Sequence, residues 1–115
     1  MTNPELTISK RLCALADIAD AGAIEVVATV DDVTESLIVL RRGDAARAFL
    51  NVCPHAGRRL DWAPGRFLFD QGFLVCAAHG ACFSVPEGLC VSGPCRGQSL
   101  SSVEVAVING DVQLV

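Results

Sequence analysis

The sequence lacks a long apolar run. No stretch reaches the roughly 18 to 20 consecutive apolar residues that a membrane-spanning helix needs. Near the start of the chain, the apolar segment that follows Lys10 and Arg11 covers only residues 12–16, and acidic residues come soon after it. This segment is shorter than the core of a signal peptide. We therefore expect no membrane segment and a cytoplasmic location.

Basic residues are scarce relative to acidic residues. Nine lysines and arginines stand against thirteen aspartates and glutamates, which gives a formal net charge of −4. Binding to nucleic-acid phosphates normally needs a basic face, so this balance excludes a general nucleic-acid binder. Six of the arginines lie between residues 41 and 66, where only two acidic residues accompany them. This basic region is either ordinary solvated surface or a surface that helps a partner to dock.

Helical periodicity and low-complexity tracts are also missing. Hydrophobic residues make up 51% of the 115 residues and charged residues 19%, which is typical of a folded protein. Short β-branched runs alternate with turn residues, and Asn109-Gly110 between two apolar runs is a strong hairpin signal. We therefore predict one all-β domain over residues 1–115, an antiparallel sandwich or barrel of short strands. The strands are expected at residues 24–30, 36–40, 48–52, 66–69, 73–76, 103–108 and 112–115.

Histidine is rare too, and the only two histidines each accompany a cysteine. Cys53 and His55 form a C-x-H pair, and Cys76 and His79 form a C-x-x-H pair. Each pair directly follows an expected strand and is therefore expected in a loop. Two soft thiolates and two neutral imidazoles suit a two-iron, two-sulfide cluster, with the cysteines on one iron and the histidines on the other. The alternative is a structural zinc site, although zinc sites usually group the two cysteines in one knuckle.

The residues around these pairs resemble a known signature. Residues 53–60 read C-P-H-A-G-R-R-L and residues 76–83 read C-A-A-H-G-A-C-F, and together they are similar to the signature of Rieske iron–sulfur proteins. Gly57 and Gly80, which come after the histidines, are expected to let backbone N–H groups approach the bridging sulfides. Residues 93–94, Gly-Pro, resemble the loop that covers the cluster from a third side.

The resemblance implies one Rieske-type [2Fe–2S] cluster held by a two-loop part of the chain, at about residues 50–97. In this family, one cysteine from each loop binds a buried inner iron, and one histidine from each loop binds an outer iron near the surface. The inner iron is therefore expected on Cys53 and Cys76, and the outer iron on His55 and His79.

The sequence departs from the high-potential members of this family at four positions. Those members carry a cysteine in each loop for a disulfide, where this chain has Arg58 and Ala78. They also carry a serine and a tyrosine that donate hydrogen bonds to sulfur, where this chain has Ala81 and Phe83. Hydrogen bonds to sulfur stabilise the reduced cluster, so we expect a midpoint potential on the order of −150 to 0 mV.

These features predict an electron-transfer protein with no catalytic residues. No histidine remains for a mononuclear iron, and no glycine-rich nucleotide fingerprint is present. The resemblance implies a soluble, monomeric ferredoxin that passes electrons from a flavin-dependent reductase to a terminal oxygenase. Arg58 and Arg59 are the candidates for contact with these partners. The alternatives are a small non-catalytic subunit of a larger oxidoreductase, of nitrite-reductase type, or a redox-sensing binding protein.

The other four cysteines are not needed as cluster ligands. Cys13 and Cys82 are expected to pack as small core residues. Cys90 and Cys95 are near enough in sequence to pair, but two free thiols are favoured in a reducing compartment. Trp62, after the first loop, is expected to be a packing anchor, and a docking role for its exposed edge is the alternative.

Overall fold

The computed structural model describes residues 10–54 and 57–115, and His55 lies outside this part of the chain. Eleven strands and a short 3-10 helix, Leu15–Asp17, account for the regular structure of these residues. Within the described residues, no helix is long and apolar enough to cross a membrane. The strands are β1 (Arg11–Ala14), β2 (Ala23–Val30), β3 (Val33–Arg42), β4 (Ala45–Leu50), β5 (Leu68–Asp70), β6 (Phe73–Val75), β7 (Cys82–Phe83), β8 (Cys90–Ser92), β9 (Ser102–Val103), β10 (Val105–Ile108) and β11 (Asp111–Leu114).

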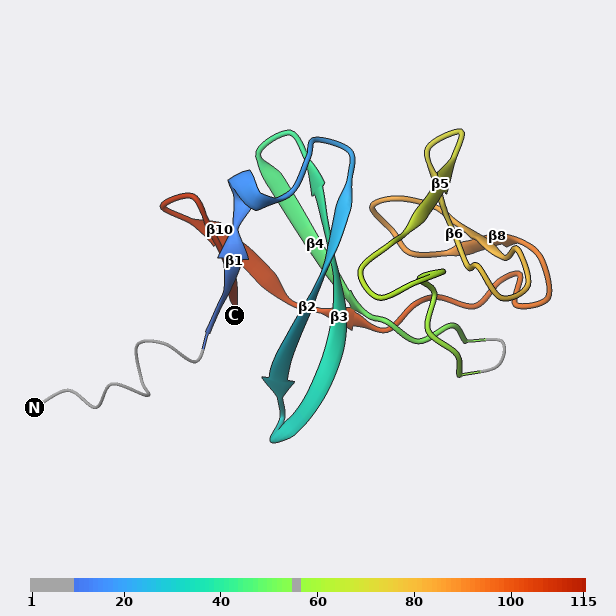
Figure 1. Cartoon of the computed structure of the whole chain (residues 1–115), viewed down its shortest axis with the longest axis horizontal. Coiled ribbons are helices and arrows are strands. Elements are labelled where there is room, and N and C mark those ends of the chain that lie inside the picture. The colour runs from blue at the N-terminus through green and yellow to red at the C-terminus, as the bar shows by residue number, and fades with distance from the viewer. Residues whose placement is uncertain (1–9, 55–56) are drawn as a thin grey trace, which may run out of the picture.

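The strands form three antiparallel sheets, which confirms the predicted all-β class. The central sheet has the order β2-β3-β4-β9, and a second sheet has the order β1-β11-β10. The third sheet, which we call the loop-bearing sheet, has the order β5-β6-β7-β8. Figure 1 shows the central sheet between the other two, with the loop-bearing sheet on the right.

The run Leu37–Leu40 on β3 explains why the central sheet is covered on both faces. All four side chains are buried. Because successive side chains of a strand point to opposite faces, Leu37 and Val39 pack into one core cluster, whereas Ile38 and Leu40 pack into another. The second cluster also contains Phe49 and the buried cysteines of the loop-bearing sheet. The cluster around Ile38 and Leu40 therefore holds the loop-bearing sheet against one face of the central sheet, and the cluster around Leu37 and Val39 packs the second sheet against the other face.

Two hairpins are built on turns that the sequence predicts. Asn109 and Gly110 have φ angles of +52° and +80° between β10 and β11. Gln71 and Gly72 have φ angles of +52° and +83° between β5 and β6. Positive φ at both central residues gives these turns the twist that antiparallel strands require. The second hairpin leads the chain from β6 directly into the loop that begins at Cys76.

The strand boundaries depart from the prediction in two ways. The strand expected at residues 36–40 extends over Val33–Arg42, because β2 and β3 stay paired up to a tight turn. Strands β7 and β8 were not expected. They have only two and three residues, so their pairing depends on neighbouring strands more than on a recognisable sequence pattern.

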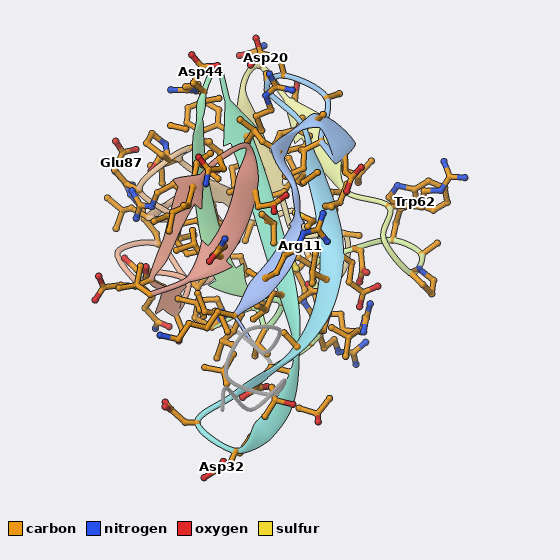
Figure 2. The ribbon with its side chains drawn as sticks, turned by 90° about the vertical axis from the view of Figure 1, so that its left-hand side faces the viewer. Arg11, Asp20, Asp32, Asp44, Trp62 and Glu87 are labelled. Carbon is orange, nitrogen blue, oxygen red and sulfur yellow. The ribbon has the colours of Figure 1, made fainter. Side chains whose placement is uncertain are left out.

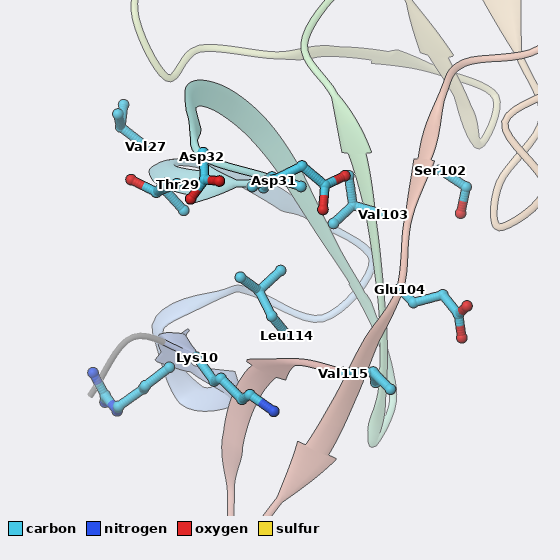
Figure 3. A pocket seen from close by; sticks show the side chains of 13 residues that line it. Lys10, Val27, Thr29, Asp31, Asp32, Ser102, Val103, Glu104, Leu114 and Val115 are labelled. Carbon is cyan, nitrogen blue, oxygen red and sulfur yellow. The ribbon is translucent and has the colours of Figure 1, made fainter. Parts of the chain in front are cut away.

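A groove of about 890 Å³ lies beside the turn between β2 and β3 (Figure 3). Lys10 and Arg11 line it together with Asp31, Asp32 and Glu104. Of the described residues that line the groove, none belongs to the loops that carry the predicted ligands. The groove is therefore separate from the candidate site.

Candidate functional site

The two predicted ligand loops are closed by the same pattern of backbone hydrogen bonds. The N–H of Cys53 donates to the carbonyl oxygen five residues later at 2.7 Å, and the N–H of Cys76 does the same at 2.8 Å. The N–H groups of Gly57 and Gly80 donate back to the carbonyl oxygens of these cysteines, each at 2.9 Å. The loops differ in the position of the histidine, which is the second residue after Cys53 and the third after Cys76.

Gly57 and Gly80 are required for their backbone conformation. Their φ angles are +66° and +73°, and residues other than glycine seldom adopt this region. Their own N–H groups donate to carbonyl oxygens of their own loops. The role of these glycines is to close the two turns.

The two predicted inner ligands lie together in the core. Cys53 is 2% exposed and Cys76 is fully buried. Burial raises the pKa of the Cys76 thiol, and the adjoining Cys53 sulfur adds to this rise, whereas the N–H groups of Ala78 and His79 oppose it. Two thiols in contact, with backbone N–H groups directed at one of them, are a preformed site for a metal that binds thiolates.

His79 is exposed at the surface end of the second loop, and His55 lies outside the described residues. Across residues 10–54 and 57–115, no three histidine, cysteine or acidic side chains gather closely enough to hold a single metal ion. A tetrahedral zinc site would bring Cys53, Cys76 and His79 around one ion. Two buried thiols and a surface imidazole on this pair of loops are a donor set that a two-iron cluster divides between its irons.

Backbone contacts join the two loops and bring a third loop over them. The N–H of Ala77 donates to the carbonyl oxygen of Leu60 at 3.0 Å, which links the second loop to the first. Gly93, in the turn after β8, packs against the second loop so closely that an added Cβ would lie 2.8 Å from the Cα of Ala81. The predicted three-sided arrangement of loops is therefore present.

The comparisons with known proteins agree with this geometry. The family model of the Rieske [2Fe-2S] domain matches residues 10–109. The chain belongs to this family. Its cofactor is one [2Fe–2S] cluster, as the ligand loops suggest. A search of curated protein sequences finds no match for this Rieske protein.

Solved structures show the same fold. The ferredoxin of carbazole 1,9a-dioxygenase from Nocardioides aromaticivorans IC177 is 25% identical, with 91% of this chain and 94% of that one covered and a TM-score of 0.67. A chain in a complex of reduced oxygenase and oxidised ferredoxin in carbazole 1,9a-dioxygenase is 28% identical, with 91% and 90% covered and a TM-score of 0.70. A small subunit assigned to an NADPH nitrite reductase shares the fold at 18% identity, with 91% and 95% covered and a TM-score of 0.65.

The surface of the Rieske protein between the ligand loops is a shallow depression of about 520 Å³. Arg58, Trp62, Ala77 and Ala78 are among its lining residues. Trp62 is 58% exposed and projects from the molecule in Figure 2, so the expectation that it anchors packing is wrong. It lies at a tight turn closed by Arg66, which keeps the indole outside the core.

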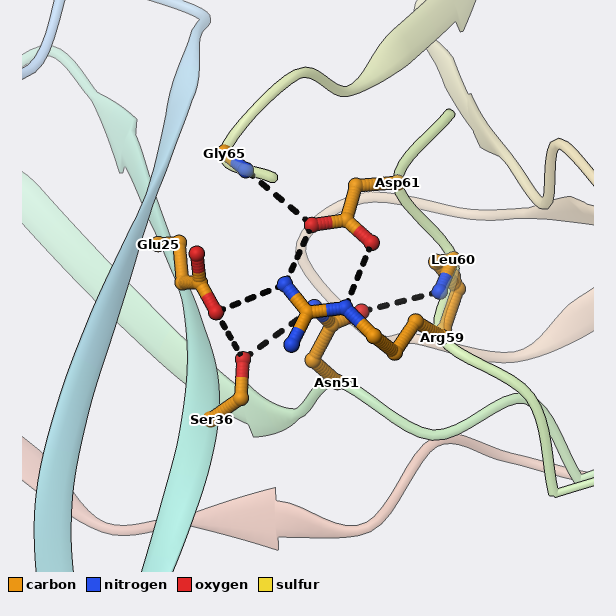
Figure 4. Close-up of polar contacts among 7 residues, drawn as sticks. All are labelled: Glu25, Ser36, Asn51, Arg59, Leu60, Asp61 and Gly65. Atoms are coloured by element: carbon orange, nitrogen blue, oxygen red, sulfur yellow. Dashed lines mark hydrogen bonds and ion pairs between the residues drawn. The ribbon is translucent and has the colours of Figure 1, made fainter. Parts of the chain in front are cut away.

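The two arginines predicted to meet a partner differ in their surroundings. In the described part of the chain, the Arg58 guanidinium takes part in no ion pair. The Arg59 guanidinium contacts both Asp61 and Glu25 at 2.7 Å (Figure 4). Arg58 therefore remains the better candidate for docking. Sequence reasoning gave no sign of this difference, because Glu25 is 34 residues away from Arg59 along the chain.

The remaining cysteines are all free thiols. Cys13 is buried in the core, as expected, and Cys82 is partly buried with its sulfur 3.6 Å from the carbonyl oxygen of Gly80. Cys90 and Cys95 are buried with their sulfurs 3.1 Å apart. Burial raises the pKa of Cys95 to about 12, and the neighbouring sulfurs add to this rise. The Cys95 thiol therefore stays protonated at neutral pH, and both thiols pack in the core cluster that contains Cys53 and Cys76.

Proposed function

We propose that this Rieske protein is a one-electron carrier whose cluster is held by Cys53, His55, Cys76 and His79. The observation that carries the proposal is the pair of matching loops, which bury two thiols in contact and place His79 at the surface. When bound, a [2Fe–2S] cluster supplies a site that takes up and releases a single electron. The buried cysteines anchor such a group, and the surface histidines give the electron a short path to a partner.

The proposed partners are a flavin-dependent reductase and a terminal oxygenase. Two kinds of support favour them: the likeness to a dioxygenase ferredoxin over 91% of this chain, and the depression between the ligand loops. An exposed tryptophan beside an unpaired arginine is typical of a surface that a partner covers. We propose that the carrier works as a monomer in the cytoplasm and forms short-lived complexes with both proteins.

Electron paramagnetic resonance of the anaerobically purified protein after dithionite reduction tests the cluster and its ligands. We expect a spectrum with the low average g value of a histidine-ligated [2Fe–2S] centre, together with two irons and two acid-labile sulfides per chain. Cys53→Ser should abolish the signal. Cys82→Ser, in the second loop but not a predicted ligand, should leave it unchanged. A silent sample that contains zinc and no acid-labile sulfide would overturn the proposal.

A sizing column distinguishes a free carrier from a bound subunit. A free carrier purified from its native source should elute as a monomer and transfer electrons to several acceptors. Co-elution with a large oxidoreductase through every purification step would replace the ferredoxin role with that of a small subunit.

A further inference from the structure

Arg59 lies at the end of the first ligand loop, where the backbone forms hydrogen bonds with both loops. On one side of it, the carbonyl oxygen of Arg58 accepts the N–H of Cys53 at 2.7 Å. On the other side, the carbonyl oxygen of Leu60 accepts the N–H of Ala77, the residue after Cys76 in the chain, at 3.0 Å. A movement of the backbone at residue 59 would therefore disturb both loops.

The Arg59 side chain ties this segment to the central sheet. Its Nε and one terminal nitrogen donate to the two carboxylate oxygens of Asp61 at 3.0 and 2.7 Å. The same terminal nitrogen donates to Oε2 of Glu25, on β2, at 2.7 Å. The Ser36 hydroxyl on β3 donates to that oxygen as well, at 2.6 Å. One guanidinium thus connects a ligand loop to two strands of the sheet beneath it (Figure 4).

Asn51 closes this arrangement into a ring of hydrogen bonds. Its Nδ2 donates to the Ser36 hydroxyl at 3.2 Å, and its Oδ1 accepts the N–H of Leu60 at 2.9 Å. The Asp61 carboxylate also accepts the N–H of Gly65 at 3.1 Å. Asn51 is 2% exposed, and in the described residues every buried side-chain nitrogen or oxygen has a partner. Buried polar groups that are fully satisfied in this way hold a single geometry.

The charged side chains of this ring lie next to the first ligand loop, so they affect the electrostatic potential at the proposed cluster site. The Asp61 side chain is 2% exposed and that of Glu25 is 17% exposed. Burial alone would raise the pKa of Asp61, but hydrogen bonds from Arg59 and Gly65 outweigh it and hold this pKa below its usual value. Asp61 and Glu25 formally place two negative charges beside the first loop, and the Arg59 guanidinium, which contacts both, offsets one of them. Without Arg59 the local charge falls from −1 to −2.

We propose that Arg59 is a positioning residue of the cluster site: it fixes the first ligand loop on the central sheet and offsets the charge of Asp61 and Glu25, and through both it sets the reduction potential. This inference rests on the proposed function. It assigns Arg59 a role distinct from partner docking, which is left to Arg58. Nearby negative charge disfavours the addition of an electron, so the loss of Arg59 makes the midpoint potential more negative.

Protein-film voltammetry of the cluster-loaded protein and three variants tests the proposal. Arg59→Met should shift the midpoint to more negative values, by more than the matched control Arg58→Met, which removes the same charge from an exposed and unpaired side chain. Arg59→Met combined with Asp61→Asn, which restores the local charge to −1, should recover most of the shift. If Arg59→Met and Arg58→Met give equal shifts, the inference is wrong and Arg59 belongs with the surface arginines.

Glu25→Gln provides a second test, which applies if the Arg59→Met variant loses its cluster. This variant lies on β2, outside the ligand loops, and its amide oxygen still accepts the hydrogen bonds of Arg59 and Ser36. It should shift the midpoint to more positive values, and an unchanged midpoint would overturn the inference. The spectrum of the unmodified protein distinguishes a failure of the proposed function from a failure of the role proposed for Arg59. If it shows no histidine-ligated [2Fe–2S] signal, the proposed function fails; if it shows the signal and the variants do not shift as stated, only the role of Arg59 fails.

Discussion

Single residues around the sulfurs set the expected potential of this protein. Ala81 and Phe83 are fully buried beside the second ligand loop, and neither carries a hydroxyl. The buried thiols of Cys90 and Cys95 contact each other, and a thiol is a weak hydrogen-bond donor. Apart from the backbone N–H groups directed at Cys76, the sulfurs of the site therefore have neighbours that lack hydroxyl donors, which supports the prediction of a midpoint near the lower end of the Rieske range.

Introduced hydroxyl groups should raise the midpoint. We expect Ala81→Ser and Phe83→Tyr each to increase it by about 40 mV, because a hydrogen bond worth about 1 kcal/mol more to the reduced state corresponds to about that shift for one electron. Square-wave voltammetry measures the change. Phe69→Tyr, on the exposed β5, is the control and should leave the midpoint where it is. A midpoint above about +200 mV in the unmodified protein would contradict the premise.

At the scale of strands and loops, local turn chemistry was predictable and long-range contacts were not. The Asn109-Gly110 turn and the β5–β6 hairpin follow from residues that tolerate positive φ, so the sequence predicts them well. The C-x-H and C-x-x-H pairs likewise mark the two loops that are predicted to carry the ligands. The exposure of Trp62 and the pairing of Arg59 with Glu25 depend on how distant segments pack, and no local pattern carries that information.

The third loop offers a test of how the loops depend on one another. Gly93 has a φ angle of +103°, and a Cβ there would lie 2.8 Å from the backbone of Ala81. Gly97 has a similar φ of +91°, but its Cβ would meet nothing within 4 Å. A substitution at either glycine would therefore strain the backbone, whereas only a substitution at Gly93 would also clash with the second ligand loop.

Gly93→Ala should therefore be more harmful than Gly97→Ala. We expect Gly97→Ala to lower the free energy of unfolding by about 1–2 kcal/mol through backbone strain alone. Gly93→Ala should cost about 1–3 kcal/mol more and shorten the lifetime of the cluster in the presence of a chelator. Urea unfolding and the decay of visible absorbance measure the two effects. Equal losses in the two variants would show that the third loop does not press on the second.

For the molecule as a whole, the distribution of charge matters more than its total. The formal charge is −4, yet six arginines lie between residues 41 and 66. Several of them are engaged within the fold: Arg41 donates to backbone carbonyl oxygens, and Arg47 lies over the ring of Phe49 at 5.5 Å. Arg58 differs, since it lines the depression between the ligand loops without an ion pair among the described side chains. Under the proposed function, this positive charge lies beside the surface through which the electron leaves.

Small charged oxidants test the electrostatic effect of Arg58 on electron transfer without a protein partner. Arg58→Glu should slow the oxidation of the reduced protein by ferricyanide, an anion, several-fold at low ionic strength and speed its oxidation by hexaamminecobalt, a cation. Both effects should fade near 1 M salt, where the screening length is about 3 Å. Lys10→Glu, which makes the same charge change at the groove beside the β2–β3 turn, should alter neither rate appreciably. If the two variants respond alike, only the net charge of the protein matters, and Arg58 has no special part in directing electron transfer.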